Sequence, residues 1–125
     1  MHAAGLPISA ATAEHYASGA GADGWHLVRA DGLSVIQERM PPGSAELRHR
    51  HAAARQFFFV LAGQLEIEVE GTVHVLRPRE GLEIAPGLAH EVRNAGVEPA
   101  EFLVVSQPPS HGDRMPAALS SPEDG

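Results

Sequence analysis

The stretch that decides the fold runs from Gly43 to Gly63 and reads Gly-Ser-Ala-Glu-Leu-Arg-His-Arg-His-Ala-Ala-Ala-Arg-Gln-Phe-Phe-Phe-Val-Leu-Ala-Gly. Its first half contains His49 and His51, two positions apart. Because alternate side chains of a β-strand point to the same face, both imidazoles can converge on one ion. Gln56 follows after a short alanine-rich bend. The stretch therefore predicts a pair of strands with metal ligands on the first.

A second segment, from Gly81 to Asn94, supplies a third histidine. His90 lies just after the tight turn formed by Pro86 and Gly87. Three imidazoles together with one oxygen donor are a ligand set that suits a first-row transition metal. The sequence therefore predicts a metal site built from two separate segments.

The rest of the chain between residues 25 and 107 follows a β pattern. Leu65, Ile67 and Val69 alternate with glutamates, which predicts a strand with one apolar face and one face in water. Turn residues separate such runs about every 8 to 12 positions, as in an all-β sandwich or barrel. His74 is expected on the surface. We expect strands at residues 25–29, 33–40, 46–51, 56–61, 64–70, 72–76, 82–85, 90–94 and 101–106.

The two ends of the chain have different compositions. Residues 1–24 form an N-terminal extension in which Ser9 to Tyr16 predicts one short helix, and residues 108–125 are expected to form a flexible tail. Gly19, Gly21 and Gly24 spell the dinucleotide-binding fingerprint. Because a predicted helix precedes them and a strand follows, the context is the reverse of the required one, and we discount the motif.

The composition narrows the chemistry. The chain has 125 residues, a formal charge of −7 at pH 7, eight histidines, and neither lysine nor cysteine. Schiff bases need a lysine amine, and thiolate catalysis and disulfides need cysteine, so these are excluded. The acidic balance and the scattered arginines argue against a nucleic-acid partner. We expect one cytoplasmic domain, since no apolar run approaches the roughly 20 residues that span a bilayer and no targeting signal is found.

The histidine pair and its surroundings resemble the first motif of the cupin superfamily, specifically of its small single-domain members. That motif is a Gly, five residues, His-x-His, three or four residues, Glu, six residues and Gly. The chain matches every spacing, with Gly43, His49, His51, Gln56 and Gly63 at the five positions.

The second cupin motif is matched in part. It is a Gly, five residues, Pro-x-Gly, two residues, His, three residues and Asn, and Gly87, His90 and Asn94 occupy the last three positions. The proline lies one position late, at Pro86, and the opening glycine is replaced by Arg79. The resemblance covers residues 33–107. It implies a jelly-roll barrel of antiparallel strands with a metal near its mouth.

Gln56 stands where many metal-binding cupins have a glutamate ligand. Its amide oxygen can coordinate, but it brings no charge, so a divalent ion held by three neutral histidines and Gln56 keeps its full charge and favours an anionic ligand. Alternatively Gln56 turns away, or the change marks a degenerate site that has lost the metal. The ligand set suits Fe, Mn, Ni, Zn or Cu and does not choose among them.

Other side chains have expected places around this site. We expect the face of Gln56 to continue into a cavity lined by Phe58, Val60 and Val92. Asn94 either reaches the site or closes a turn through its side chain. The segment from Ser110 to Arg114 either folds over the barrel mouth and brings its arginine to an anionic substrate or remains an unpaired tail. Glu38 is the one candidate catalytic carboxylate, provided that it shares the inner face of its strand with Ser34 and Ile36.

The resemblance leaves two classes of function open. In the first, the metal supports dioxygenase-like or isomerase-like chemistry on a small anionic or oxygen-rich molecule. In the second, the same pocket binds a small ligand without turnover, as a sensor. Phe57 and Phe59 face away from the cavity, and small cupins are commonly dimers, so we expect a homodimer that covers them.

Overall fold

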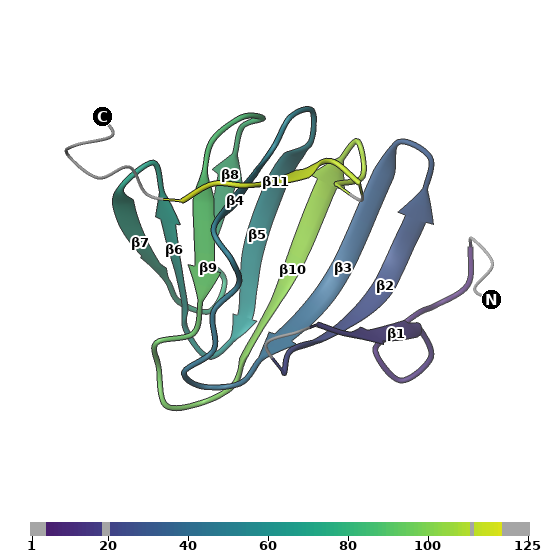
Figure 1. Cartoon of the computed structure of the whole chain (residues 1–125). Coiled ribbons are helices and arrows are strands. Elements are labelled where there is room, and N and C mark those ends of the chain that lie inside the picture. The colour runs from purple at the N-terminus through teal and green to yellow at the C-terminus, as the bar shows by residue number, and fades with distance from the viewer. Residues whose placement is uncertain (1–4, 19–20, 111, 119–125) are drawn as a thin grey trace.

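The computed structural model of the chain describes residues 5–18, 21–110 and 112–118. These residues form two antiparallel sheets that face each other (Figure 1), which confirms the all-β prediction. The six-stranded sheet has the order β1-β2-β3-β10-β5-β8 and the five-stranded sheet the order β11-β4-β9-β6-β7. The strands are β1 (Glu14–Ala17), β2 (Asp23–Ala30), β3 (Leu33–Met40), β4 (His49–His51), β5 (Arg55–Ala62), β6 (Leu65–Val69), β7 (Thr72–Leu76), β8 (Gly81–Ile84), β9 (His90–Arg93), β10 (Ala100–Gln107) and β11 (Arg114–Pro116).

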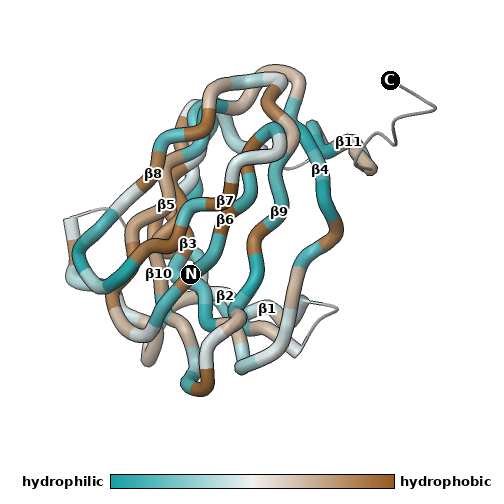
Figure 2. The backbone as a smooth tube through the Cα atoms, turned by 90° about the vertical axis from the view of Figure 1, so that its left-hand side faces the viewer, coloured by the Kyte–Doolittle hydropathy of each residue, from teal (hydrophilic) through white to brown (hydrophobic). Residues whose placement is uncertain are grey.

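The core lies between the two sheets and is built from buried residues of β3, β5, β6, β7, β8, β9 and β10. In β10 the burial alternates regularly, with Phe102 and Val104 inside. The tube in Figure 2 shows the contrast between strands, since β4 is hydrophilic along its length whereas the neighbouring β9 includes an apolar residue. The side chains that fill the core include Met40, Phe58, Val60, Leu65, Ile67, Ile84, Val92 and Phe102.

The turn between β6 and β7 forms where the sequence predicts it, but the faces of β7 differ from the prediction. Glu70 and Gly71 both have positive φ, 47° and 93°, as a two-residue hairpin turn requires. The prediction for His74 was wrong, because the register places it opposite the buried Ile67 and it is half-buried, whereas Val73 is 48% exposed. His74 and Leu76 therefore lie on the inner face of β7, and Val73 and Val75 lie on its outer face.

The predicted helix from Ser9 to Tyr16 is wrong. Two backbone hydrogen bonds to the carbonyl of Ser9 make a single turn there, and the chain then continues as β1, which pairs with β2. Tyr16 lies opposite Gly24 in this pairing, and a Cβ at position 24 would overlap the tyrosine ring. Of the glycines that imitate a nucleotide-binding fingerprint, Gly19 lies outside the described residues, while Gly24 belongs to β2 and leaves room for an aromatic ring.

Part of the segment expected to be a loose tail forms a strand. β11 crosses one end of the molecule and pairs with β4 (Figure 1), with Arg114 opposite His51 and Pro116 opposite His49. Just before β11, the carboxylate of Asp113 accepts hydrogen bonds from the backbone N–H groups of three successive residues at 2.9–3.1 Å, those of Ala52, Ala53 and Ala54. The loop after the histidine pair is thus held by the C-terminal segment.

A buried ion pair fixes the other end of β11. The Arg48 guanidinium donates to both carboxylate oxygens of Glu68, at 2.7 and 3.0 Å, and to the carbonyl oxygen of Ala117 at 2.9 Å. Glu68 belongs to the face predicted to be in water, but it is 5% exposed because this pairing satisfies its charge. No helix in the described residues is long and apolar enough to cross a membrane.

Candidate metal centre

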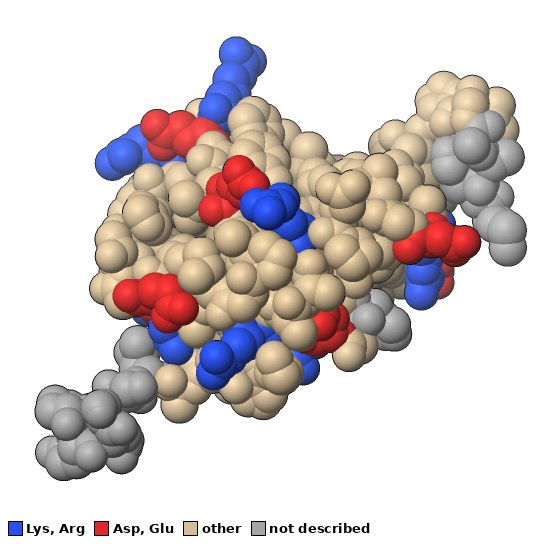
Figure 3. All heavy atoms as spheres, turned by 90° about the horizontal axis from the view of Figure 1, so that it is seen from above, with Lys and Arg blue, Asp and Glu red and all other residues tan. Residues whose placement is uncertain are grey.

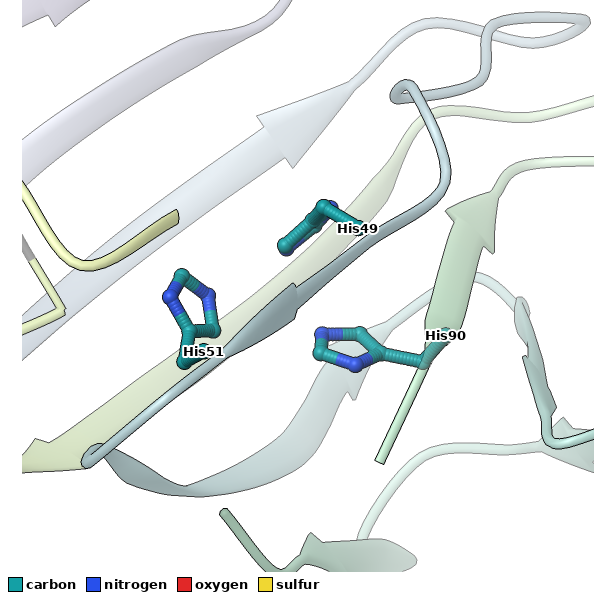
Figure 4. Close-up of side chains that lie close together, drawn as sticks. All are labelled: His49, His51 and His90. Carbon is teal, nitrogen blue, oxygen red and sulfur yellow. The ribbon is translucent and has the colours of Figure 1, made fainter. Parts of the chain in front are cut away.

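Three histidines from two adjacent strands converge on one point. His49 and His51 on β4 are buried, while Arg50 between them is exposed. His90 begins β9, and the strand register places it directly opposite His49. One nitrogen from each ring lies within 4.8 Å of the others. Figure 4 shows the three rings turned toward a common space.

Backbone carbonyls orient two of these rings. Nδ1 of His49 lies 2.8 Å from the carbonyl oxygen of Leu47, and Nδ1 of His90 lies 3.0 Å from that of Leu88. A carbonyl oxygen only accepts, so both Nδ1 atoms donate, and each Nε2 keeps its lone pair for a metal. Nε2 of His90 and Nδ1 of His51 are buried and have no hydrogen-bond partner among the described residues. Buried polar atoms normally have a partner, and these unpaired ring nitrogens are available to ligate a metal ion.

Burial keeps the three imidazoles neutral. The loss of surrounding water lowers the pKa of His49 to about 4 and lowers the pKa values of His51 and His90 as well. The charge of Arg114 acts in the same direction on all three rings. Neutral imidazole is the form that binds metal, so the site is ready for an ion well below the usual histidine pKa.

The low pKa of His49 makes the metal-free protein sensitive to acid. The His49 ring takes up a proton near pH 6.5 in the unfolded chain but near pH 4 in the folded protein. The free energy of unfolding therefore decreases as the pH falls from about 6.5 to about 4. From about pH 7.5 to about pH 5 this loss amounts to about 2 kcal/mol for His49. The raised pKa of Glu38 makes the folded protein more stable as the pH falls, which opposes the effect of His49. The contribution of His49 is therefore measured as a difference between the wild type and a variant without this ring.

We expect the His49→Gln variant to lose about 2 kcal/mol less unfolding free energy than the wild type over this pH interval. Urea denaturation of both proteins in EDTA, at the two pH values, measures the difference. Parallel pH profiles for the two proteins would contradict the burial of a neutral His49.

Gln56 lies on the opposite sheet, on the wall of the cavity that His49 and His51 also line. Its Nε2 donates to Oγ of Ser106 at 3.0 Å, which fixes the amide orientation. Its Oε1 is buried and has no hydrogen-bond partner among the described residues. Register pairs Ser106 with both Gln56 and Ser34, so a polar row crosses three strands at this level. The amide therefore presents an unpaired oxygen donor inside the cavity.

The cavity beside the histidines has a volume of about 500 Å³. Glu38 lies on its wall together with Ser34 and Ile36, the placement that the sequence argument required. The Tyr16 hydroxyl donates to Oε2 of Glu38 at 2.9 Å. Burial, and after it the nearby carboxylate of Glu46, raise the pKa of Glu38 to about 7 against the opposing effects of the Tyr16 hydrogen bond and the Arg114 charge. A carboxyl with a pKa near neutrality can both take up and release a proton.

Tyr16 and Glu46 are cavity residues that the sequence argument missed. Tyr16 was assigned to a helix, and its strand character follows only from its pairing with β2. Burial also raises the pKa of Glu46, which lies within electrostatic range of Glu38. In the sequence, the only signal for Glu46 was its position between Gly43 and His49 of the first motif. The cavity thus combines a histidine cluster, a pair of carboxyls and an exposed arginine, Arg114.

Three predicted lining residues lie elsewhere. Val60 and Val92 are 0% exposed in the core and are not part of the cavity wall, because each lies two residues, about 7 Å, beyond Phe58 or His90 along its strand. The Asn94 amide donates to the carbonyl oxygens of Met40 and Glu98, which is the turn-closing alternative. Phe58 does line the cavity.

The charged surface agrees with the scattered arginines of the sequence. In the view from above, arginines and acidic side chains are interspersed over the visible face (Figure 3). Over the described residues, several arginines are paired with acidic side chains of a neighbouring strand, as in the contact of Arg93 with Glu66 at 2.5 Å and that of Arg55 with Glu83 at 2.6 Å. The visible face therefore presents no continuous basic patch.

Comparison with known proteins agrees with the motifs and the fold. The model of the cupin domain matches residues 36–106, which is more than half of the chain. This chain belongs to the cupin family. The cupin fold accounts for the two facing sheets and for the histidine cluster between the β4 and β9 strands.

Relatives of this cupin have varied activities. A protein named polyketide synthase CurC, from Streptomyces cyaneus, is 33% identical over 72 residues, which are 58% of this chain and 44% of that protein. The polyketide cyclase RemF from Streptomyces resistomycificus has a TM-score of 0.77 at 19% identity, over 95% of this chain and 88% of its own. A sugar phosphate isomerase from Silicibacter pomeroyi has a TM-score of 0.73 at 23% identity, over 82% and 75%. This cupin spans less than half the length of the matched curated protein CurC, and the two structural likenesses show the fold alone.

Proposed function

We propose that this cupin is a metal-dependent enzyme that moves a proton on a small, oxygen-rich carbonyl compound. The observation that carries the proposal is Glu38, a half-buried carboxyl with a pKa raised to about 7 that lines the same cavity as His49 and His51. Carboxyls that serve as general bases at neutral pH are tuned in this way by burial and by neighbouring charge.

The residues present fit a divalent transition metal. His49, His51 and His90 would hold it through nitrogens that lie close together, and the unpaired Oε1 of Gln56 would supply the oxygen donor. A bound ion supplies a Lewis acid that polarises a carbonyl and lowers the pKa of the adjacent C–H bond. With four neutral ligands the ion keeps its charge, so the site favours an anionic substrate.

Glu38 supplies the base. Its ionised carboxylate removes a proton from the carbon next to the substrate carbonyl, and the resulting carboxylic acid returns the proton to a neighbouring carbon or oxygen. Tyr16 donates to Oε2, which leaves Oε1 for this exchange and holds the carboxyl on the cavity wall. Phe58 and Val104 supply apolar wall that limits water around the reacting atoms.

The relatives support a carbonyl substrate. A polyketide is a chain of alternating carbonyl and methylene carbons, and sugar isomerisation also moves a proton next to a carbonyl. Both names among the relatives are therefore consistent with enolisation as the shared chemical step. A cavity of about 500 Å³ accommodates a small compound of this kind.

The test follows hydrogen exchange in heavy water. We expect the metal-loaded protein to catalyse deuterium uptake at the CH₂ carbon of hydroxyacetone, detected by proton NMR, without consuming oxygen. Oxygen uptake with acetylacetone and no deuterium uptake would replace the proposal by a dioxygenase. Tight binding with neither reaction would replace it by a binding protein.

We also propose that two copies associate through the outer face of β5. The Phe57 and Phe59 rings stack there with centroids 6.1 Å apart, and Phe57 is 40% exposed. We expect sedimentation velocity to give about twice the chain mass of 13.2 kDa, and Phe57→Glu to give the monomer, since a charge there would be desolvated. A wild type that sediments as a monomer would overturn this proposal.

A further inference from the structure

The β11 strand brings one cation into the cavity beside the histidine cluster. Arg114 pairs with His51 in the register of β11 and β4, and paired residues of neighbouring strands share a face of the sheet. Arg114 lines the cavity, while Met115, opposite the outward Arg50, points away from it. The arginine therefore lies on the same side of the five-stranded sheet as the proposed metal ligands.

This arginine has few partners of its own. Its Nη2 donates to the carbonyl oxygen of Leu47 at 3.3 Å, and within residues 5–18, 21–110 and 112–118 it forms no ion pair. The other arginine on the cavity wall, Arg29, is paired with Glu14 at 2.9 Å. Arg114 is also exposed, so a ligand that enters the cavity can reach its guanidinium.

The segment that carries Arg114 is held at both ends. Asp113 accepts three backbone hydrogen bonds from the loop after β4, and Arg48 donates to the carbonyl of Ala117. An arginine presented by a fixed strand loses less conformational entropy on binding a ligand than one on a mobile tail. The structure thus favours the first of the two alternatives for this segment, in which it lies against the barrel and contributes to the cavity.

We propose that Arg114 binds the carboxylate of the substrate, so that the substrates of this cupin are carbonyl compounds that carry a carboxylate. This inference rests on the proposed function. A planar guanidinium matches a carboxylate through two parallel hydrogen bonds. A doubly charged phosphate fits less well, because the same cavity contains Glu38 and Glu46 and a single unpaired arginine.

The cavity has a separate place for each end of such a substrate, with Arg114 for the carboxylate and the histidine cluster and carboxyl pair for the carbonyl end. Arg114 lines the same cavity as His49, His51, Glu38 and Glu46, so its guanidinium and the carboxyl pair border one space beside the histidine cluster. A carboxylate held by Arg114 would leave the adjoining carbonyl and its neighbouring carbon within the space between these groups. Arg114 would act as a specificity-determining residue.

Two compounds of almost the same shape test this inference. Hydroxypyruvate and hydroxyacetone differ in a carboxylate that replaces a methyl group. In the metal-loaded protein, we expect Arg114→Gln to weaken hydroxypyruvate binding about 10- to 100-fold by isothermal titration, the usual effect of losing a charge-assisted pair. Hydroxyacetone binding should change less than about twofold. The metal is the same in both proteins, so the difference reports the arginine.

The matched control is Arg50→Gln, which removes an exposed arginine from the outer face of β4, the strand that pairs with β11. It should leave the binding of both compounds unchanged. Arg114→Lys keeps the charge but loses the two-pronged geometry, and we expect it to recover only part of the hydroxypyruvate affinity. If the thermal melting curve shows that Arg114→Gln does not fold, two other measurements decide the question. They are the preference of the wild type for hydroxypyruvate over hydroxyacetone and the partial loss of that preference in Arg114→Lys.

Other outcomes overturn the inference separately from the proposed function. Equal weakening of both compounds, or none, would show that Arg114 does not bind the carboxylate, even if deuterium exchange proceeds. Tighter binding of inorganic phosphate than of hydroxypyruvate would assign the arginine to a phosphate group instead. Arginine-dependent binding of hydroxypyruvate without deuterium exchange would keep the carboxylate site and overturn the proposed enzyme.

Discussion

Replacing His90 by alanine is expected to abolish metal binding. The change removes one of three nitrogens that share a single space and leaves His49 without its ring neighbour at 4.5 Å. Loss of a group that merely orients a ligand commonly costs 10- to 100-fold in metal affinity, so loss of a ligand itself should exceed about 100-fold. Elemental analysis of protein produced without a histidine tag, compared with the wild type, measures the result.

The matched control for this experiment is His15→Ala. His15 pairs with Asp23 at an exposed edge of the other sheet, so its removal should leave the metal content unchanged. Gln56→Ala should weaken metal binding to an intermediate extent, because a neutral amide oxygen is a poorer ligand than an imidazole. A wild type without metal, or equal metal in the wild type and His90→Ala, would refute the site.

The Glu38→Gln variant should lose most of the deuterium exchange activity. Glutamine keeps the shape of the side chain and accepts the Tyr16 hydrogen bond, but it cannot take up a proton from carbon. General-base catalysis is typically worth about 10²- to 10⁴-fold, and we expect kcat to fall within that range while hydroxyacetone binding is retained. The wild-type rate should rise with pH around 7, as Glu38 ionises, and the variant should lose this dependence.

The control for Glu38 is Glu83→Gln on β8. Glu83 is exposed and pairs with Arg55 at 2.6 Å, so this variant makes the same chemical change away from the cavity. Metal content measured on all three proteins separates a lost base from a lost ion. An unchanged rate in Glu38→Gln would rule out Glu38 as the base and turn attention to Glu46.

The site histidines and most strands could be predicted because their information is local. Period-two alternation identified strands such as β3 and β10, and the spacing of His49, His51 and Gln56 matched a known motif. The motif resemblance identified His90 as the third ligand, whereas its position opposite His49 depends on the pairing of β4 with β9. Glu38 could be assigned to the cavity because it shares one face of its strand with Ser34 and Ile36, as alternate residues of a strand do.

The remaining features depend on contacts between distant segments. Nothing in the residues from Glu14 to Ala17 distinguishes a strand from a helix until β2 lies beside them. Likewise, β11 has three residues and includes Pro116, so its strand character comes from pairing with β4. The Asn94 side chain closes a turn and does not reach the site, because its amide donates to the carbonyl oxygens of Met40 and Glu98.

The pairing of β4 with β11 bears on how the metal centre forms during protein synthesis. His49, His51 and His90 are all synthesised before residue 91. The segment from Asp113 to Pro116, which pairs with β4 and binds the loop after it, is synthesised more than twenty residues later. In the strand register, β4 pairs with its other neighbour, β9, at the single position His49–His90. A nascent chain therefore carries every histidine ligand before it has the scaffold that holds two of them, so metal capture belongs to the end of folding.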